Sequence, residues 1–246
     1  MPYIRNQQFE PLELQQPLWR YMDFTKFVAM LVTKSLYLTR VDKLCKLGDR
    51  FEGSFPNVPE KGFRGFFGET DTERYYTEKN KDKKRFYYVN CWHGNNSESD
   101  AMWKIYVRGN QGIAVRSTVQ RLRDSLQKAP QNIWIGNVKY LDKFTWRSVP
   151  TDPTLHACLA KRKSFEHEKE VRLIWLDENG KRTGHTGQDG KEIPCLLPTL
   201  IDKVYLAPPN SPWFKRVVEN VLRRYRINTE VVQSDLGSEA LSENTL

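Results

Sequence analysis

Apolar and polar positions alternate in several stretches of the chain, and this alternation predicts β-strands separated by turns or by helical patterns. Side chains two apart share one face of a strand, whereas side chains three or four apart share one face of a helix. Strands are expected at 18–22, 35–40, 85–92, 112–118, 132–142, 204–208 and 229–233.

Helical patterns lie between these strands, and several follow a residue that can cap a helix. They are expected directly after residue 23, at 100–106, at 119–126, for a turn or two around 155–163, and from 212 to 225. The last one starts at Ser211 and Pro212, a strong helix start. We expect Met102, Trp103 and Tyr106 to pack in the core.

The order of these elements favours an α+β fold with mixed or split β-sheets and interspersed helices, although strand order cannot be read from it. We expect a single domain over 1–234, with a charged insertion near 53–84 and a polar tail at 235–246. The segment 177–193 contains Asn-Gly and Asp-Gly pairs and is expected to be turn or loop.

Three glutamates at every second position stand out in the stretch KRKSFEHEKEVRLIW. On a strand, Glu166, Glu168 and Glu170 would share one side, with Arg172 next to them. Neighbouring carboxylates raise each other's pKa, so the arrangement suits either a functional cleft or a solvated surface with ion pairs to nearby basic residues. A helix is also open, because Ser164 can cap it and Glu168 and Arg172 are four apart.

The charge balance favours an anionic partner, since 39 Lys and Arg against 30 Asp and Glu give a formal charge of +9. Solubility explains the same excess. The basic run at 79–88 is the best nucleic-acid candidate because its cations stand beside aromatic residues that can stack on bases. Its binding residues would be Lys81, Lys83, Lys84 and Arg85, and the alternative is a solvated loop.

The cysteines and histidines do not indicate a metal site. Cys45, Cys91, Cys158 and Cys195 form no C-x-x-C pair, and the histidines lack ligand spacing. Cys91 and His93 as nucleophile and base are less favoured than a buried cysteine. The N-terminus lacks a signal-peptide core and no apolar run is long enough to span a membrane, so we expect a cytoplasmic protein with free thiols.

Several longer motifs together resemble a mainly bacterial family known as domain of unknown function 2971. These motifs are LWRYMDF, SLYLTRVDKL, DRFEGSF, CWHGNNSESDAMWKIY, GIAVRST, FEHEKEVRL and VYLAP. The resemblance runs from about residue 18 to about residue 225. Arg50 departs from it, because the family has a proline there.

The order of a basic strand residue, a helix, a hydroxyl-bearing strand and a later Glu-x-Glu strand also resembles the ADP-ribosyltransferase fold. That resemblance implies that Arg20 holds NAD, that Thr39 supports the nicotinamide ribose, and that Glu170 engages this ribose. Glu168 would position the acceptor. Tyr21 is placed to stack on nicotinamide or adenine. Breaking the nicotinamide bond creates positive charge on the sugar, which a fixed carboxylate stabilises.

The sequence therefore predicts an ADP-ribosyltransferase-like enzyme that uses NAD as substrate, needs no metal, and modifies a nucleic acid or an intracellular protein. The alternative is a non-catalytic nucleic-acid-binding or interaction module with a basic surface. A metal-free nuclease using the carboxylates and His93 is the third hypothesis. Convergence of Arg20, Thr39 and Glu170 on one pocket would favour the enzyme.

Overall fold

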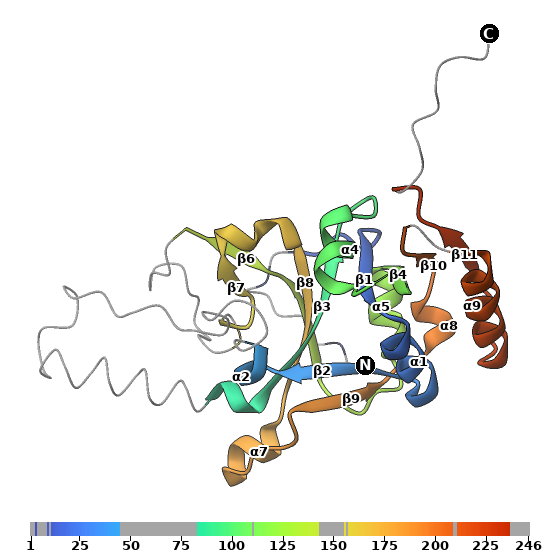
Figure 1. The fold of residues 1–246 in the computed structure, drawn as a ribbon. Helices are drawn as coiled ribbons and strands as arrows, with labels where there is room; N and C mark the ends of the chain where they lie inside the picture. The colour runs from blue at the N-terminus through green and yellow to red at the C-terminus, as the bar shows by residue number, and fades with distance from the viewer. Residues whose placement is uncertain are drawn as a thin grey trace, which may run out of the picture.

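The computed structural model describes residues 3, 9, 11–44, 83–109, 111–142, 155, 157–208 and 211–236 (Figure 1). The strands are β1 (Pro17–Asp23), β2 (Ser35–Arg40), β3 (Tyr87–Gly94), β4 (Gly112–Thr118), β5 (Ile133–Asn137), β6 (Lys139–Leu141), β7 (Ala160–Arg162), β8 (Glu170–Leu176), β9 (Gly190–Pro194), β10 (Lys203–Leu206) and β11 (Glu230–Gln233). The helices are α1 (Phe24–Thr33), α2 (Val41–Leu44), α4 (Asp100–Tyr106), α5 (Val119–Ser125), α7 (Glu178–Thr183), α8 (Leu197–Leu200) and α9 (Pro212–Arg224), with 3-10 helices η1 (Lys84–Phe86) and η3 (Lys163–Glu168).

Nine of the described strands form one mixed sheet, and β6 and β7 form a separate parallel pair. The main path runs β11-β10-β4-β1-β3-β2-β9, and β8 pairs with both β3 and β5. The pairs are antiparallel except for β10 with β11. The predicted α+β class with a mixed sheet and interspersed helices is confirmed.

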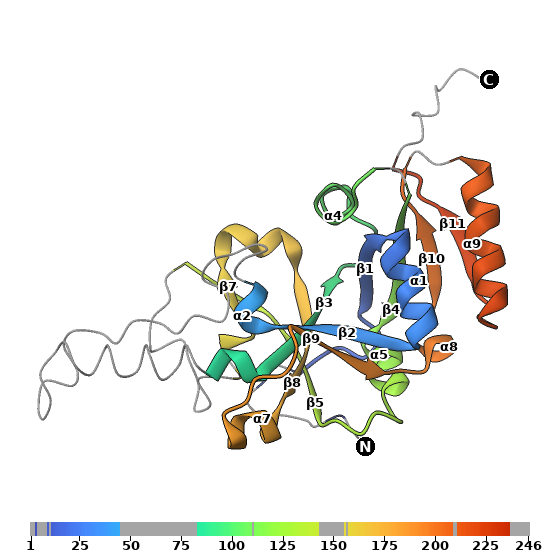
Figure 2. The same ribbon diagram turned by 60° about the horizontal axis from the view of Figure 1, so that its bottom comes forward.

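The sheet divides at β3. Strand β8 runs along one edge of β3 from Tyr87 to His93, so β1 and β2 must share the other edge. β2 pairs there with Tyr88 and Val89, whereas β1 pairs with His93 and Gly94. In Figure 2, β2 runs across the direction of β1, β4 and β10. We call the interval between these two short ladders, residues 90–92, the β3 gap.

Two polar side chains bridge the β3 gap in place of strand pairing. Asn90 Nδ2 donates to the Tyr37 carbonyl of β2 (2.8 Å). Arg20 Nη1, from β1, donates to the Cys91 carbonyl (2.8 Å). A buried or half-buried backbone carbonyl needs a partner, and these side chains supply one where the strands diverge. The backbone carbonyl of Cys91 therefore holds the Arg20 side chain at the β3 gap.

The strands on either side of the β3 gap form two arms: the β1 arm (β1, β4, β10 and β11) and the β2 arm (β2 and β9). The largest apolar cluster takes side chains from both arms and from α1, which connects them. Its members include Leu18, Met22, Phe27, Leu31, Leu36 and Leu38, all buried. Helix α9 adds Phe214, Val218 and Leu222, and it lies within the helix expected from 212 to 225, although Trp213 and Val217 are exposed. The polar groups at the β3 gap thus lie beside a well-packed apolar core.

The structure corrects several local predictions. The segment 177–193, expected to be a loop, contains α7 and the edge strand β9, because β9 pairs along β2 although Ile193 is its only buried residue. The strand expected from residue 85 begins at Tyr87, after η1. Residues 45–82, with most of the expected insertion, and residues 237–246 lie outside the described part. No helix among the described residues is long and apolar enough to cross a membrane.

Replacing Asn90 with alanine is expected to lower the free energy of unfolding by about 1–3 kcal/mol, the usual cost of leaving buried polar groups without partners. Asn90 is 2% exposed, and its Oδ1 also accepts from Trp92 Nε1 (2.8 Å). Urea denaturation followed by circular dichroism measures the change. The control is Asn220→Ala on the exposed side of α9, which is expected to change stability by less than about 0.5 kcal/mol. Equal effects in both variants would contradict a bridging role for Asn90.

Candidate active site

The two glutamates of the predicted site come together through a sharp turn. Between η3 and β8, Lys169 takes a left-handed conformation (φ 40°) that residues other than glycine rarely adopt. Its N–H donates to Glu166 O (3.1 Å), and its carbonyl accepts from Gly94 N–H (2.8 Å). The expected strand with three glutamates on one side is therefore wrong: Glu166 is exposed, and only Glu168 and Glu170 turn inward.

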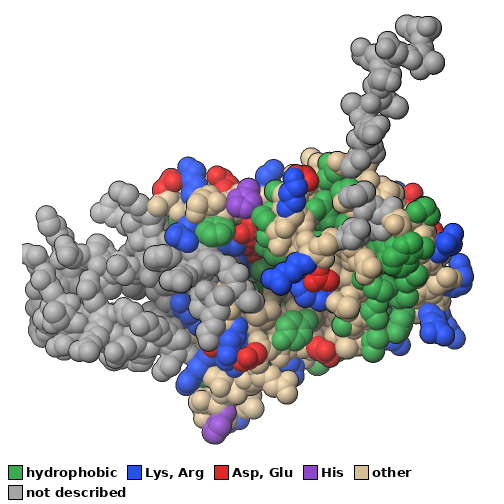
Figure 3. Space-filling view, in the orientation of Figure 1, with side chains coloured by type: hydrophobic (Ala, Val, Ile, Leu, Met, Phe, Trp, Pro, Cys, Tyr) green, Lys and Arg blue, Asp and Glu red, His purple; other side chains and the backbone are tan. Residues whose placement is uncertain are grey.

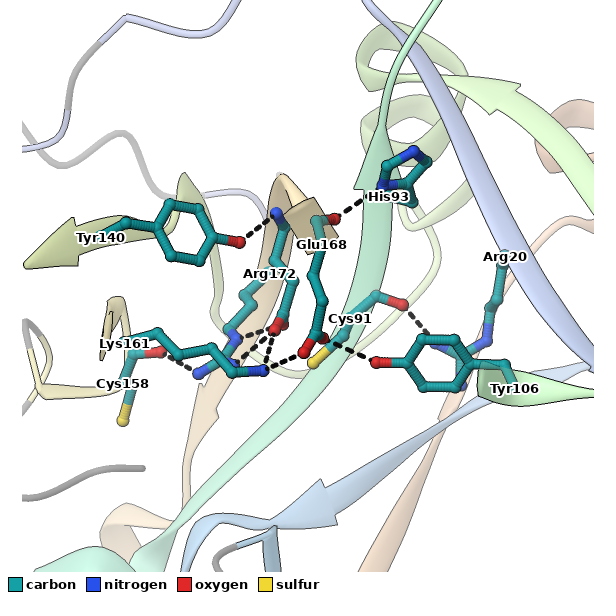
Figure 4. Close-up of polar contacts among 10 residues, drawn as sticks. Arg20, Cys91, His93, Tyr106, Tyr140, Cys158, Lys161, Glu168 and Arg172 are labelled. Carbon is teal, nitrogen blue, oxygen red and sulfur yellow. Dashed lines mark hydrogen bonds and ion pairs between the residues drawn. The ribbon is translucent and has the colours of Figure 1, made fainter. Parts of the chain in front are cut away.

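Glu170 lies in a buried ion cluster. Arg172 donates through Nε to Oε2 (2.7 Å) and through Nη2 to Oε1 (3.0 Å), and Lys161 Nζ of β7 donates to Oε1 (2.7 Å). Arg172 also donates to the Cys158 carbonyl (2.8 Å). These contacts, drawn in part in Figure 4, are buried rather than the exposed surface pairs considered from sequence, because Lys161, Glu170 and Arg172 are at most 5% exposed. Buried ion pairs of this kind need all their partners.

Glu168 joins the same cluster from η3. Lys161 Nζ donates to its Oε1 (2.9 Å), and the Tyr106 hydroxyl, from the end of α4, donates to its Oε2 (2.7 Å). Its backbone carbonyl lies 2.7 Å from His93 Nδ1. Glu168 is thus held from three elements, and one of its contacts, Tyr106, is 43% exposed. Of the two buried carboxylates, Glu168 is the one joined to a side chain that reaches solvent.

The surroundings drive the pKa values of the two carboxylates apart. Burial, followed by the negative charge of Glu170, raises the pKa of Glu168. Burial would also raise the pKa of Glu170, but Arg172 and Lys161 outweigh it and hold that pKa well below its usual range. The ionised form is thus favoured at Glu170 and the protonated form at Glu168, and active sites commonly contain carboxylates whose pKa values are separated in this way.

Arg20 faces this cluster from the other side of β3. It is half-buried, and burial lowers its pKa, while Tyr106 lies close enough to act on its charge (Figure 4). Asp23, at the end of the same strand as Arg20, pairs with Lys26 (3.3 Å). Within the described ranges no carboxylate pairs with Arg20, so its guanidinium retains N–H donors for an anion.

His93 presents a buried nitrogen without a partner. A carbonyl oxygen cannot donate, so the contact with Glu168 O requires that His93 Nδ1 carries the proton. Burial lowers the pKa of His93 and favours the neutral ring, which leaves Nε2 as an acceptor. His93 is 6% exposed, and Nε2 has no hydrogen-bond partner among the residues described. An N–H or O–H of a ligand would satisfy it.

The structure places Thr39 away from the carboxylates, whereas Tyr21 lies beside His93. Tyr21 is buried, its hydroxyl accepts from Ser99 N–H (2.8 Å), and its ring packs against Trp103 and lies 6.2 Å from the His93 ring between ring centres. Thr39 is half-buried and level with Val89, four positions along β3 from His93. At about 3.3 Å per residue it lies about 13 Å along the strand from the level of Glu170.

The basic residues proposed for nucleic acid do not join the site. Lys83 lies beside η1, which contains Lys84 and Arg85 at the start of β3, whereas the carboxylates lie near its end. His93 lies six positions along the strand from Tyr87, roughly 20 Å. Lys81 lies outside the described residues. Among the residues described, no group of three His, Cys, Asp or Glu side chains could hold a metal ion.

Sequence reasoning considered Lys161 only as an exposed ion-pair partner of the two glutamates, and it missed the contact of Tyr106. The register of β6 with β7 and the fold of η3 turn Lys161 inward toward both carboxylates. Tyr106 was expected in the core, which is wrong because its ring is half-exposed. Helical spacing placed Tyr106 near Met102 and Trp103, but no local pattern predicts a contact with Glu168, 62 residues later.

No family model matches the chain. No curated protein matches it in sequence. Among solved structures, it is similar to Thermus sp. 2.9 DarT in complex with NAD+, with 11% identity, a TM-score of 0.42, and coverage of 91% of this chain and 98% of that one. For Thermus sp. 2.9 DarT in complex with ADP-ribosylated ssDNA the identity is 11%, the TM-score 0.43, and the coverage 92% and 98%.

Proposed function

We propose that this protein is an ADP-ribosyltransferase that cleaves NAD at the bond between nicotinamide and ribose and transfers ADP-ribose to a nucleic-acid or protein acceptor. The observation that carries the proposal is the convergence at the β3 gap. Arg20, a half-buried cation without a carboxylate partner, and Glu168, a buried carboxylate with a raised pKa, lie there on either side of β3. The bacterial and cytoplasmic setting remains a prediction.

Arg20 would bind the diphosphate of NAD. A guanidinium offers paired N–H donors that match phosphate oxygens, and partial burial strengthens such contacts. One donor of Arg20 is occupied by the Cys91 carbonyl, which fixes the side chain and leaves the others available. The buried Nε2 of His93 would accept from a substrate N–H or O–H. Thr39 and Tyr21 keep the roles implied by the resemblance only as proposals.

The two carboxylates would divide the work. When the bond from C1′ to the nicotinamide nitrogen breaks, its electron pair leaves with nicotinamide and the sugar becomes cationic. Glu170 has three donors from Lys161 and Arg172 and would remain an ionised, fixed support. The resemblance assigns the sugar to Glu170 and the acceptor to Glu168. Because Glu168 is nearer to solvent through Tyr106, we instead assign to Glu168 the contact with the sugar and the proton that the acceptor releases as it bonds to C1′.

Isothermal titration with NAD, followed by a nicotinamide-release assay, tests the proposal. Wild type is expected to bind NAD and release nicotinamide, and Arg20→Met to bind NAD about 10- to 100-fold more weakly, because hydrogen bonds to charged groups contribute about 1.5–3 kcal/mol. Arg123→Met is the control, since Arg123 pairs with Asp124 on the surface. Absence of NAD binding in folded wild type would refute the transferase.

The alternative is a non-catalytic nucleic-acid-binding or interaction module, favoured by the formal charge of +9. In Figure 3 the basic side chains are spread over the visible face rather than gathered in one patch. If NAD does not bind while DNA or RNA binds with strong salt dependence, and Lys84→Ala with Arg85→Ala weakens that binding, this alternative holds.

A further inference from the structure

Contacts at the beginning of helix α4 fix the position of the end of this helix beside the carboxylate cluster. Ser99 caps the helix by accepting from Met102 N–H, and its own N–H donates to the Tyr21 hydroxyl of β1 (2.8 Å). Trp103 packs edge-on against the Tyr21 ring, with 4.9 Å between ring centres. Helix α4 is therefore attached to the β1 arm, and Tyr106 at its last position projects from that arm.

Tyr106 contacts a residue outside the β1 arm. Its hydroxyl donates to Glu168 Oε2 (2.7 Å), at the last position of η3 and two residues before β8 begins (Figure 4). The ring is 43% exposed, whereas Glu168 is 6% exposed. Tyr106 is thus a wall between solvent and a buried carboxylate, with only its polar tip turned inward.

The two oxygens of Glu168 are held differently. Oε1 accepts from Lys161 Nζ, which Glu170 shares, so this contact is fixed by the charge balance of the whole cluster. In the described part of the chain, the Tyr106 hydroxyl is the sole partner of Oε2. We call Oε2 the outer oxygen of Glu168. Its direction therefore depends on the Tyr106 O–H group.

We propose that Tyr106 is a positioning residue for the transferase reaction: its hydroxyl fixes the outer oxygen of Glu168 and so sets the direction in which that carboxylate faces the substrate. This inference rests on the proposed function and extends it to a residue outside the Glu-x-Glu segment. A phenol O–H suits the task because it donates without adding charge to a cluster in which, among the described residues, two cations balance two anions.

The contact also has a pH signature. The charged and titratable groups around Glu168 are Lys161 of β7, Glu170 and Arg172 of β8, Cys91 and His93 of β3, Arg20 of β1 and Tyr106 of α4. Of these, Tyr106 lowers the pKa of Glu168 by donating to its ionised form. Its removal is expected to raise that pKa further, so the acid limb of nicotinamide release moves to higher pH.

Tyr106→Phe removes the hydroxyl and keeps the ring, and Tyr37→Phe, at an exposed tyrosine of β2, is the matched control. Carboxyl titration by NMR of protein labelled with ¹³C-glutamate, with Glu168 assigned from the Glu168→Gln spectrum, is expected to show Glu168 titrating at higher pH in Tyr106→Phe only. At fixed pH, kcat is expected to fall about tenfold with KM little changed, as the loss of one hydrogen bond of about 1.4 kcal/mol predicts.

The two measurements separate this inference from the proposed function. The carboxyl titration needs no turnover, so it tests the Tyr106 contact even if wild type releases no nicotinamide, an outcome that would overturn the catalytic role. An unchanged Glu168 titration in Tyr106→Phe would overturn the positioning role even in an active enzyme. A loss of activity equal at every pH would indicate a packing defect and also overturn it.

Discussion

Replacing Arg172 with methionine is expected to lower the free energy of unfolding by about 3–5 kcal/mol, because removing one partner of a buried ion pair leaves the other charge uncompensated. Arg172 is 1% exposed and supplies two of the three donors to Glu170. Lys161 alone would then face two buried carboxylates. Urea denaturation of the variant and of wild type at neutral pH measures the difference.

The control and a second variant make this expectation specific. Arg123→Met breaks a surface pair with Asp124 (3.1 Å) and is expected to cost about 0–1 kcal/mol. The double variant Glu170→Gln with Arg172→Met removes the uncompensated charge, so we expect it to be more stable than Arg172→Met alone. A loss for Arg172→Met no larger than that of the control would show that the cluster does not stabilise the fold.

Glu168→Gln is expected to lower the rate of nicotinamide release at least about a hundredfold with NAD binding retained, since removal of a preorganised electrostatic group commonly has this effect. The amide keeps the shape of the side chain, but it carries no negative charge for the sugar and cannot take a proton. Saturating NAD in the release assay separates the rate from the affinity.

Two neighbouring variants on the same segment show whether position or charge decides the result. Glu166→Gln changes an exposed residue and is expected to leave the rate unchanged. Glu170→Gln is expected to lower both rate and stability, because it weakens the pairing with Arg172 and Lys161. If Glu166→Gln slowed release as much as Glu168→Gln, the assignment of Glu168 would be wrong.

Local sequence patterns predicted the helices and strands in which apolar residues recur at regular spacing. The face of α9 and the strands around Leu18, Leu36 and Ile113 follow from apolar spacing, because each contributes buried side chains to one core. Strand β9 escaped prediction because its residues are mostly polar and exposed, so its pairing with β2 defines it.

The site was predicted only in part for a similar reason. Glu168 and Glu170 were correctly expected to lie on one side, although strand alternation was the wrong cause, since the left-handed Lys169 turns both inward. Lys161 was considered as a partner of these carboxylates only on an exposed surface, and Tyr106 was not predicted as a partner. Their contacts join segments that approach one another only in the folded sheet, and the spacing of residues along the chain does not predict such contacts.

The β3 gap has a mechanical consequence. One arm carries Arg20 and, through α4, Tyr106, whereas the strand that carries Glu170 stays paired along the whole of β3. Both β1 and β8 bury side chains in the same apolar cluster, so β1 could not turn about residues 90–92 without repacking that core. The spacing between guanidinium and carboxylate is thus held by the shared core on which both strands pack, and not by a continuous ladder between β1 and β3.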